Sequence, residues 1–437
     1  KSLEIMQKVL DENHPSLATN YINISMIYKD LGDLEKALEY SKKALNIPNI
    51  DTSIKSILYN HMYTVFKELN IDKKALKYKF KSLILMGEVF QIDKLIVSDF
   101  FSLKDITISN LKNKKEVYIV GENGDGKSLL LQSIIIALKG TSDGVITDFI
   151  KDSPKFNIQL NKKSNTKHTC SNLFTYSVYR NNSYLNNKED ELGYLNMFDS
   201  SFKLKNIKDW LKDLKLIESE KFENSNISFK FANKLLRKLL DRDINIEVKS
   251  AKVIFSEKGE EVSFEKLSSG YRNIIQIICD LLIRLSEKQP FVNDLKDYRG
   301  IVIIDELELH LHPKLIYTFV SKLRKLFPKI QFIMTTHSPT ALLGASPDAV
   351  FYKIYKDNGK VFLSEQIKNE GYTSNTLITS PLFNLPTTKS GNYKGLISDD
   401  DYVYEKIHKV VHDKIKENIN INEEELLRFI TEEFNKL

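Results

Sequence analysis

Residues 121–128 constrain the fold of this chain more than any other segment. They read Gly-Glu-Asn-Gly-Asp-Gly-Lys-Ser, the complete G-x-x-x-x-G-K-[ST] pattern of a phosphate-binding loop. Such a loop joins a strand to a helix, and both neighbours are indicated. Residues 117–120 are a short apolar run that favours a strand, and residues 129–138 are an apolar helical run. The sequence therefore predicts an α/β nucleotide-binding domain.

The residue types in the loop suit a triphosphate and a magnesium ion. Its glycines permit backbone angles that side chains would block, so N–H groups can face phosphate oxygens beside the positive end of a helix. Lys127 can reach the β- and γ-phosphates, and the Ser128 hydroxyl can ligate Mg²⁺. We therefore predict ATP and Mg²⁺ as cofactors. The predicted nucleotide-binding residues of the loop are Gly121, Glu122, Asn123, Gly124, Asp125, Gly126, Lys127, Ser128 and Leu129.

Two apolar strands later in the chain end in chemically active side chains. The run 300–304 is aliphatic and predicts a strand buried on both faces, and Asp305 and Glu306 follow it. A carboxylate there suits a Mg²⁺ ligand, and the next suits a general base that activates water. The second strand, 330–336, is followed by His337, where a γ-phosphate would lie.

A serine-rich turn opens a long predicted helix at 273–285. Ser268, Ser269 and Gly270 offer hydroxyl and N–H groups to an anion at the start of this helix. An ordinary helix cap explains the same residues, so this turn by itself leaves both interpretations open.

The N-terminal region repeats itself. Residues 28–40 align without gaps to residues 66–78, an offset that pairs Ala37 with Ala75 and Tyr40 with Tyr78. Such self-similarity predicts a solenoid of helix pairs that resembles the tetratricopeptide repeat, and 3–10 resembles a helix of a preceding unit. The chain thus starts inside a repeat, and we expect an upstream portion. A partner-binding surface and a packing or dimerisation element explain the repeats equally well.

Composition excludes a few classes. The chain has 437 residues, which predicts two or three domains, and its two cysteines are too few for a disulfide framework and indicate a cytoplasmic location. No apolar run is long enough for a membrane span, so we predict no membrane association. The net charge of +6 permits nucleic-acid binding without arguing for it.

The order phosphate loop, Ser-Ser-Gly turn, Asp-Glu strand, Thr-His strand resembles the ABC-type ATPases, in their SMC/RecF-like branch. The resemblance covers about 92–385 and implies an α/β ABC-type head with a mixed, mostly parallel sheet. It implies that Ser128 and Asp305 serve Mg²⁺, and that Lys127, Glu306 and His337 are catalytic. It also implies a head-to-tail homodimer or higher oligomer. There, Ser268, Ser269 and Gly270 of one subunit close over ATP held by the other, although Ser269 stands where the family commonly has Gly.

Three further segments resemble the ATPases of bacterial anti-phage defence, most of all the PtuA type of Septu and retron-associated systems. They are 305–313, the strand 174–180, and the lid formed by 197–199 with 206–211. The 100 residues after His337 hold no nuclease pattern, and their acids at 399–401 suit a helix start. The resemblance therefore implies a separate HNH-type nuclease partner, PtuB-like, and retron DNA or a tRNA target as candidate nucleic acids.

We expect three parts: repeats at 1–90, an ATPase head at 91–380 with an insertion and lid at about 151–235, and a linker with a helical C-terminal segment at 381–437. The lysine-rich stretch 151–170 is either a solvated hairpin or a phosphate contact. The apolar stretch 380–388 is either a docking segment or a covered loop.

Three functions remain at this stage. The first is an ATP-hydrolysing switch that controls a nuclease in anti-phage defence. The second is a repeat scaffold that binds ATP structurally. The third is a DNA-repair ATPase, which ranks last because about 140 residues separate the phosphate loop from the Ser-Ser-Gly turn without sustained heptads. A transporter nucleotide domain fits poorly, because repeats are fused to this head.

Overall fold

The computed structural model describes residues 14–85, 90–153, 155–161, 163–164, 170–180, 188–219, 227–240, 244–249, 252–257, 260–369, 373–383 and Arg428. The chain divides into two compact units, Lys1–Asn384 and Leu385–Leu437. The predicted helix at 3–10, the acids at 399–401 and the predicted helical C-terminal segment lie outside the described residues, apart from Arg428.

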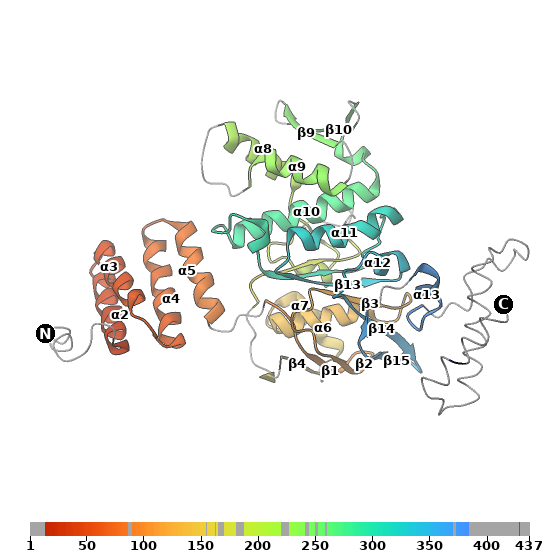
Figure 1. The fold of residues 1–437 in the computed structure, drawn as a ribbon, viewed down its shortest axis with the longest axis horizontal. Coiled ribbons are helices and arrows are strands. Elements are labelled where there is room, and N and C mark those ends of the chain that lie inside the picture. The colour runs from red at the N-terminus through yellow and green to blue at the C-terminus, as the bar shows by residue number, and fades with distance from the viewer. Residues whose placement is uncertain are drawn as a thin grey trace, which may run out of the picture. The chain divides into compact units, whose positions relative to one another are not determined.

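The N-terminal repeats form two helix pairs, as the offset of the repeat predicts (Figure 1). The first pair is α2 (Pro15–Asp30) and α3 (Leu34–Asn46), and the second is α4 (Thr52–Glu68) and α5 (Asp72–Leu85). Gly32 and Asn70, at equivalent turn positions, have φ of 79° and 57°. Ala37 and Ala75 are completely buried, so the small side chains do allow the paired helices to approach closely.

The ATPase-like head is built on one large mixed sheet. Its strand order is β5-β4-β1-β2-β15-β14-β3-β13-β12-β6, and β16 pairs with β14. The strands are β1 (Leu95–Phe100), β2 (Leu103–Ile108), β3 (Glu116–Val120), β4 (Asn157–Leu160), β5 (Lys163–Ser164), β6 (Leu173–Tyr176), β12 (Gly300–Ile304), β13 (Ile330–Thr336), β14 (Val350–Asp357), β15 (Lys360–Leu363) and β16 (Ile367–Lys368). The central strands β14, β3, β13, β12 and β6 are all parallel.

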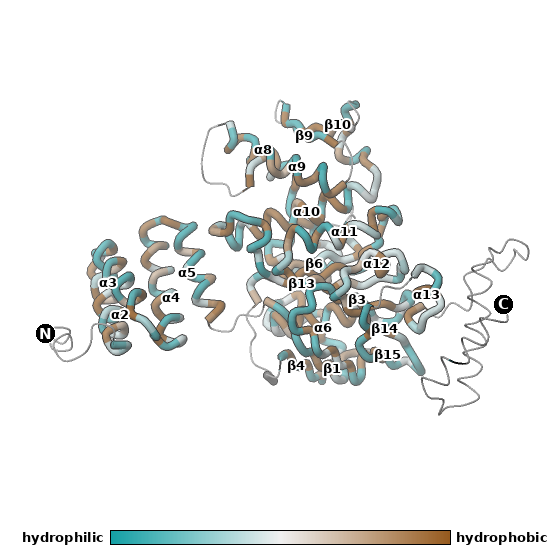
Figure 2. The backbone as a smooth tube through the Cα atoms, viewed as in Figure 1, coloured by the Kyte–Doolittle hydropathy of each residue, from teal (hydrophilic) through white to brown (hydrophobic). Residues whose placement is uncertain are grey.

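Helices cover both faces of this sheet (Figure 1). On one face α6 (Lys127–Lys139) and α7 (Gly144–Phe149) pack with Ile119, Ile303 and their neighbours. On the other, α8 (Ile207–Ser219), α9 (Phe229–Leu240), α10 (Ser269–Lys288), α11 (Pro313–Leu326) and α12 (Pro339–Leu343) pack with Val120, Ile304 and their neighbours. Successive residues of one strand enter opposite cores, as the two-residue strand period requires. Figure 2 shows hydrophobic residues gathered along these central strands.

Smaller elements complete the head. A three-stranded sheet consists of β9 (Ile244–Lys249), β10 (Lys252–Glu257) and β11 (Glu260–Val262), and β7 (Lys188–Glu189) pairs with β8 (Phe202–Lys203). Four 3₁₀ turns, η1 (Ile150–Asp152), η2 (Leu195–Met197), η3 (Phe264–Lys266) and η4 (Leu295–Asp297), and the helix α13 (Ser374–Thr379) are the remaining described elements. None of the described helices is long and apolar enough to cross a membrane.

Two predicted strands are wrong in extent. Phe100 and Phe101 do not form a strand of their own: Phe100 ends β1, and Phe101 has φ of 51° in the turn to β2. The predicted strand 174–180 ends at Tyr176, because the chain turns there to bring Arg180 back under the sheet edge. The predicted fold class, a mixed-sheet α/β head preceded by helical repeats, is confirmed.

Candidate nucleotide site

The phosphate loop connects β3 to α6 and has the backbone that its glycines predict. Gly124 and Gly126 have φ of 92° and 89°, in the left-handed region that favours glycine. A Cβ on Gly121 would lie 2.6 Å from both Cγ2 and the carbonyl oxygen of Ile354 on β14, so only glycine fits there. The Asp125 carboxylate accepts a 2.8 Å hydrogen bond from the N–H of Glu122 and braces the loop.

Lys127 is almost completely buried beneath this loop. Its Nζ donates to the carbonyl oxygens of Gly121 and Glu122 at 2.8 and 2.9 Å. The ammonium group is therefore held inside the loop by acceptors that are neutral. A triphosphate in the loop would place anionic oxygens beside this cation.

Ser128 and Asp305 meet although they come from distant segments. The Ser128 Oγ donates a 2.6 Å hydrogen bond to Oδ2 of Asp305, and Thr335 Oγ1 donates a 2.5 Å bond to Oδ1. β3, β13 and β12 are parallel neighbours, so their carboxyl ends share one edge of the sheet. This edge brings the predicted magnesium ligands together.

A magnesium ion fits this oxygen donor set. A hydroxyl and a carboxylate are hard ligands, and Mg²⁺ is usually held by one or two protein groups together with phosphates and waters. Within the described residues no cluster of three or more His, Cys, Asp or Glu side chains could hold a metal by itself. Ser128 and Asp305 would thus need phosphate oxygens to complete the coordination.

Glu306 has a strained backbone that its surroundings hold in place. Its φ is 46°, which is uncommon for a residue other than glycine, and its N–H donates to Thr335 Oγ1 at 2.8 Å. Strained backbone of this kind persists only where neighbours enforce it. Thr335, between Asp305 and Glu306, is a positioning residue that the sequence did not single out.

Arg180 is the second such residue. Its side chain is 2% exposed, and its guanidinium donates to the carbonyl oxygens of Asp305 at 2.7 Å and Glu306 at 2.8 Å. It also donates to Asn273 Oδ1 on α10 at 2.8 Å. Burial lowers the pKa of Arg180 to about 10, so the group stays charged at neutral pH. This arginine links the acidic strand end to the helix that follows the Ser-Ser-Gly turn.

His337 is paired with an acid that the sequence analysis passed over. Its Nδ1 lies 2.7 Å from Glu308 Oε1, and its N–H donates to the same oxygen at 2.6 Å. The His337 side chain is half exposed, whereas that of Glu308 is 8% exposed. The pair orients the imidazole at the end of β13.

The Ser-Ser-Gly turn lies at a different surface from the phosphate loop. Ser268 is the N-cap of α10, and its side chain accepts from the N–H of Tyr271. Ser268, Ser269 and Gly270 line a cavity of about 850 Å³ with residues 310–315. No hydrogen bond in the described part of the chain joins this turn to residues 121–128. The helix-cap interpretation holds within one chain, and the predicted contact with nucleotide stays a prediction that needs a second copy.

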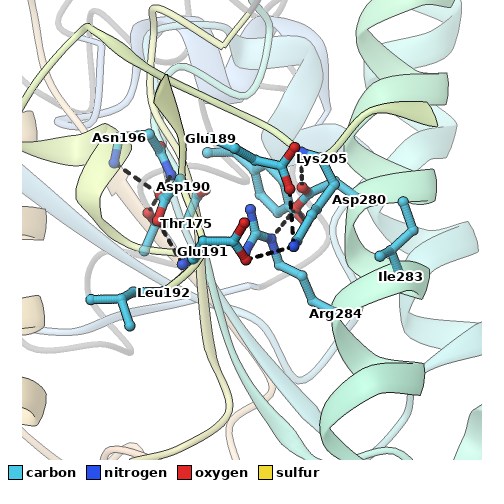
Figure 3. A network of polar contacts seen from close by, with 12 residues as sticks. Thr175, Glu189, Asp190, Glu191, Leu192, Asn196, Lys205, Asp280, Ile283 and Arg284 are labelled. Carbon is cyan, nitrogen blue, oxygen red and sulfur yellow. Dashed lines mark hydrogen bonds and ion pairs between the residues drawn. The ribbon is translucent and has the colours of Figure 1, made fainter. Parts of the chain in front are cut away.

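A buried polar network fastens the segment before α8 to α10 (Figure 3). Asp280 accepts from Arg284 Nε at 2.8 Å and from the Lys205 N–H at 2.8 Å, and Tyr176 donates to it at 3.1 Å. Asp190 accepts from both nitrogens of Asn196. The predicted lid at 197–199 and 206–211 is thus attached to the core through fully bonded side chains rather than through a free hinge at this point.

Comparisons with known proteins agree with the motifs. Residues 171–343 match the model of the family described as "AAA domain, putative AbiEii toxin, Type IV TA system", and residues 1–49 match the tetratricopeptide repeat. The Septu protein PtuA of Bacillus mycoides is 26% identical over 366 residues, which are 75% of this chain and 48% of that protein. The Retron Vc95 probable ATPase of Vibrio cholerae is 40% identical over 94 residues, 22% of this chain and 18% of that protein.

A second Septu protein PtuA, from Bacillus thuringiensis, is 30% identical over 155 residues, 34% of this chain and 38% of that protein. Among solved structures, the SMC head bound to the C-winged helix domain of ScpA is 13% identical, with a TM-score of 0.40 over 64% of this chain and 98% of that chain. This chain spans less than half the length of the relatives that it matches. The predicted resemblance to the ATPases of Septu and retron systems is confirmed.

Proposed function

We propose that this chain is the ATP-hydrolysing switch subunit of an anti-phage defence complex. The observation that carries the proposal is the joining of the Ser128 hydroxyl to the Asp305 carboxylate, with Glu306 as the next residue. One sheet edge thus holds the phosphate loop, a magnesium-binding pair and a candidate base. Its sequence relatives include proteins named Septu PtuA and retron probable ATPase.

In this proposal each side chain has a distinct task. The phosphate loop binds ATP, and Lys127 balances the charge of its β- and γ-phosphates. Magnesium, when bound at Ser128 and Asp305, would neutralise phosphate charge. Glu306 accepts a proton from the attacking water, and Arg180 and Thr335 hold its backbone at the required place. His337, oriented by Glu308, donates toward the γ-phosphate.

The assembly that we propose is a head-to-tail dimer or a higher oligomer of such dimers. Ser268 and Gly270 face a cavity away from their own phosphate loop, so a second chain would be needed to bring a loop to them. In that arrangement the N-terminus of α10 would add its partial positive charge to the γ-phosphate of the other chain. ATP would then act as the adhesive between heads.

We further propose that the effector is a separate nuclease of the HNH type. The catalytic groups of the described residues serve phosphate chemistry on a nucleotide, and the repeats offer a surface for a partner protein. We place the assembly in the cytoplasm, because Cys170 and Cys279 are both buried free thiols. The three parts 1–90, 91–380 and 381–437 are the domain division that we propose.

Glu306→Gln tests the proposal. This change keeps the size and the hydrogen-bonding atoms of the side chain but removes the base, so ATP should bind while its hydrolysis falls by roughly 10²–10⁴-fold. Mass measurement in solution should then show an ATP-dependent dimer that persists, whereas wild type returns to the lower state as ATP is consumed.

The main alternative, a repeat scaffold with structural ATP, makes the opposite prediction. For a scaffold, the glutamine variant should have the same oligomeric state, the same ATP content and the same defence activity as wild type. Undetectable ATP binding to the wild-type chain would overturn the proposal outright.

A further inference from the structure

Helix α5 has an unusual charge for a repeat helix. Its sequence, Asp-Lys-Lys-Ala-Leu-Lys-Tyr-Lys-Phe-Lys-Ser-Leu-Ile-Leu, holds five lysines and a single acid. Lys73, Lys77 and Lys81 are spaced four residues apart and so follow one face of the helix, about 6 Å from each other along its axis. Ala75 and Ser82 are buried on another face, against α4. The lysines therefore form a row that leaves the packing surface free.

This row is not required by the repeat fold, because the preceding repeat shows what the same positions hold elsewhere. At the offset of 38, Lys73 corresponds to Glu35 and Lys77 to Glu39. In α3 these acids balance the lysines: Lys43 Nζ lies 2.6 Å from Glu39. In the described part of the chain no ion pair joins Lys74, Lys77 or Lys81 to an acid.

Like charges four residues apart destabilise a helix by a few tenths of a kcal/mol per pair. Mutual repulsion of this kind acts on Lys81, whose pKa is lowered by burial and by the charge of Lys77. A surface that keeps this cost, where its sister repeat alternates the signs, is suited to an anion outside the chain. Lys74 and Lys77 are exposed and available to it.

Aromatic rings lie between the lysines. Lys81 Nζ is 5.3 Å from the ring centroid of Tyr59 and 5.4 Å from that of Tyr78. Lys79 Nζ is 5.2 Å from the ring of Tyr63 on the neighbouring helix α4. These three tyrosines are partly exposed. Positive side chains over partly exposed rings combine phosphate attraction with a surface on which bases stack.

We propose that the surface formed by Lys73, Lys74, Lys77, Lys79 and Lys81 with Tyr59, Tyr63 and Tyr78, here called the α5 lysine face, binds the backbone of a single-stranded nucleic acid. An acidic protein would satisfy the charge alone. The regular spacing of the lysines and the rings among them favour a chain of evenly spaced phosphates with bases. This inference stands apart from the ATPase proposal, since none of these residues belongs to the nucleotide site.

The test compares two double variants of the full chain. Lys73→Glu with Lys77→Glu installs the residue types that the first repeat carries at the equivalent positions, so the helix should fold. Lys325→Glu with Lys360→Glu makes the same change of net charge at exposed lysines of the head. Binding of fluorescein-labelled single-stranded DNA and RNA oligonucleotides is measured by anisotropy over a series of salt concentrations.

We expect the α5 variant to bind at least about tenfold more weakly, and its slope of log affinity against log salt to fall by about two. The control variant should keep the wild-type slope. Equal losses in both variants, or no binding by wild type at low salt, would overturn the inference. So would displacement of the oligonucleotide from neither variant nor wild type by excess unlabelled strand, or selective binding of polyglutamate at this face.

ATP hydrolysis without nucleic acid is measured in parallel. The α5 variant should hydrolyse ATP at the wild-type rate, which also shows that the chain is folded. If wild type binds oligonucleotide but hydrolyses no ATP, the proposed function fails and the α5 lysine face stands.

Discussion

Ser128 and Asp305, which are 177 positions apart in the chain, share a hydrogen bond of 2.6 Å between the hydroxyl and one carboxylate oxygen. The other oxygen of Asp305 accepts from Thr335. One carboxylate therefore ties the first turn of α6 to the ends of two parallel strands. Since both of its oxygens are engaged, a magnesium ion would have to replace the Ser128 contact by bonds of its own to both side chains.

Lys127→Ala should weaken ATP binding by about 10- to 150-fold, because a charged hydrogen bond contributes roughly 1.5–3 kcal/mol. Lys127 makes its contacts to carbonyl oxygens of the loop, so its removal also leaves these acceptors without a donor. Calorimetric titration with a non-hydrolysable ATP analogue measures the change. Affinity equal to wild type would show that the loop does not hold the triphosphate.

Gly121→Ala should impair nucleotide binding at least about tenfold through backbone crowding. The added Cβ would lie 2.6 Å from backbone and side-chain atoms of Ile354, so the loop must shift. Gly144→Ala is the matched control, since a Cβ there meets nothing within 4 Å and the residue begins helix α7. The control should change stability by less than about 0.5 kcal/mol. Similar titrations for the two variants would contradict the crowding argument.

Arg180→Met should lower stability by roughly 3–5 kcal/mol and slow hydrolysis more than it weakens ATP binding. The methionine fills a similar volume, but the carbonyl oxygens of Asp305 and Glu306 lose their donor, and Asn273 on α10 loses its link to them. Thermal unfolding with and without nucleotide, together with kcat and KM for ATP, separates the two effects.

Arg180→Lys controls for charge in that experiment, because it keeps a cation but cannot bond several acceptors in a plane. It should recover part of the stability and little of kcat. A methionine variant with wild-type stability would show that the buried guanidinium holds nothing in place.

The repeats should lose stability as the pH falls below about 6.5. His61 is buried, with Nε2 2.8 Å from Ser25 Oγ, and burial lowers its pKa from the ordinary 6.5. Below 6.5 the unfolded chain binds a proton that the folded chain does not, so acid favours unfolding. Hydrogen exchange of helices α2–α5 at pH 7.5 and pH 5.5 measures the effect. In His61→Gln the difference between the two pH values should be smaller, and an unchanged difference would assign it to other groups.

Contiguous patterns were readable from the sequence because their physics is local. The glycines at 121–126 act on their own backbone, the offset of 38 repeats one helix pair, and the apolar runs 300–304 and 330–336 need only two buried faces to be strands. The strand ends could be assigned roles as magnesium ligand and base from their residue types. The error at 174–180 arose where a turn depends on a distant partner: Arg180 turns toward carbonyls of residues 305 and 306.

The sequence by itself determined the class of domain, the nucleotide loop, the acidic strand end and the repeat, because each is written in neighbouring residues. Only the tertiary structure decided which side chains support them. The order β3-β13-β12-β6 places strands side by side that are far apart in the chain, and that order alone brings Thr335 and Arg180 to Asp305 and Glu306. No local pattern encodes such contacts, because they depend on long-range packing of the sheet and of α10.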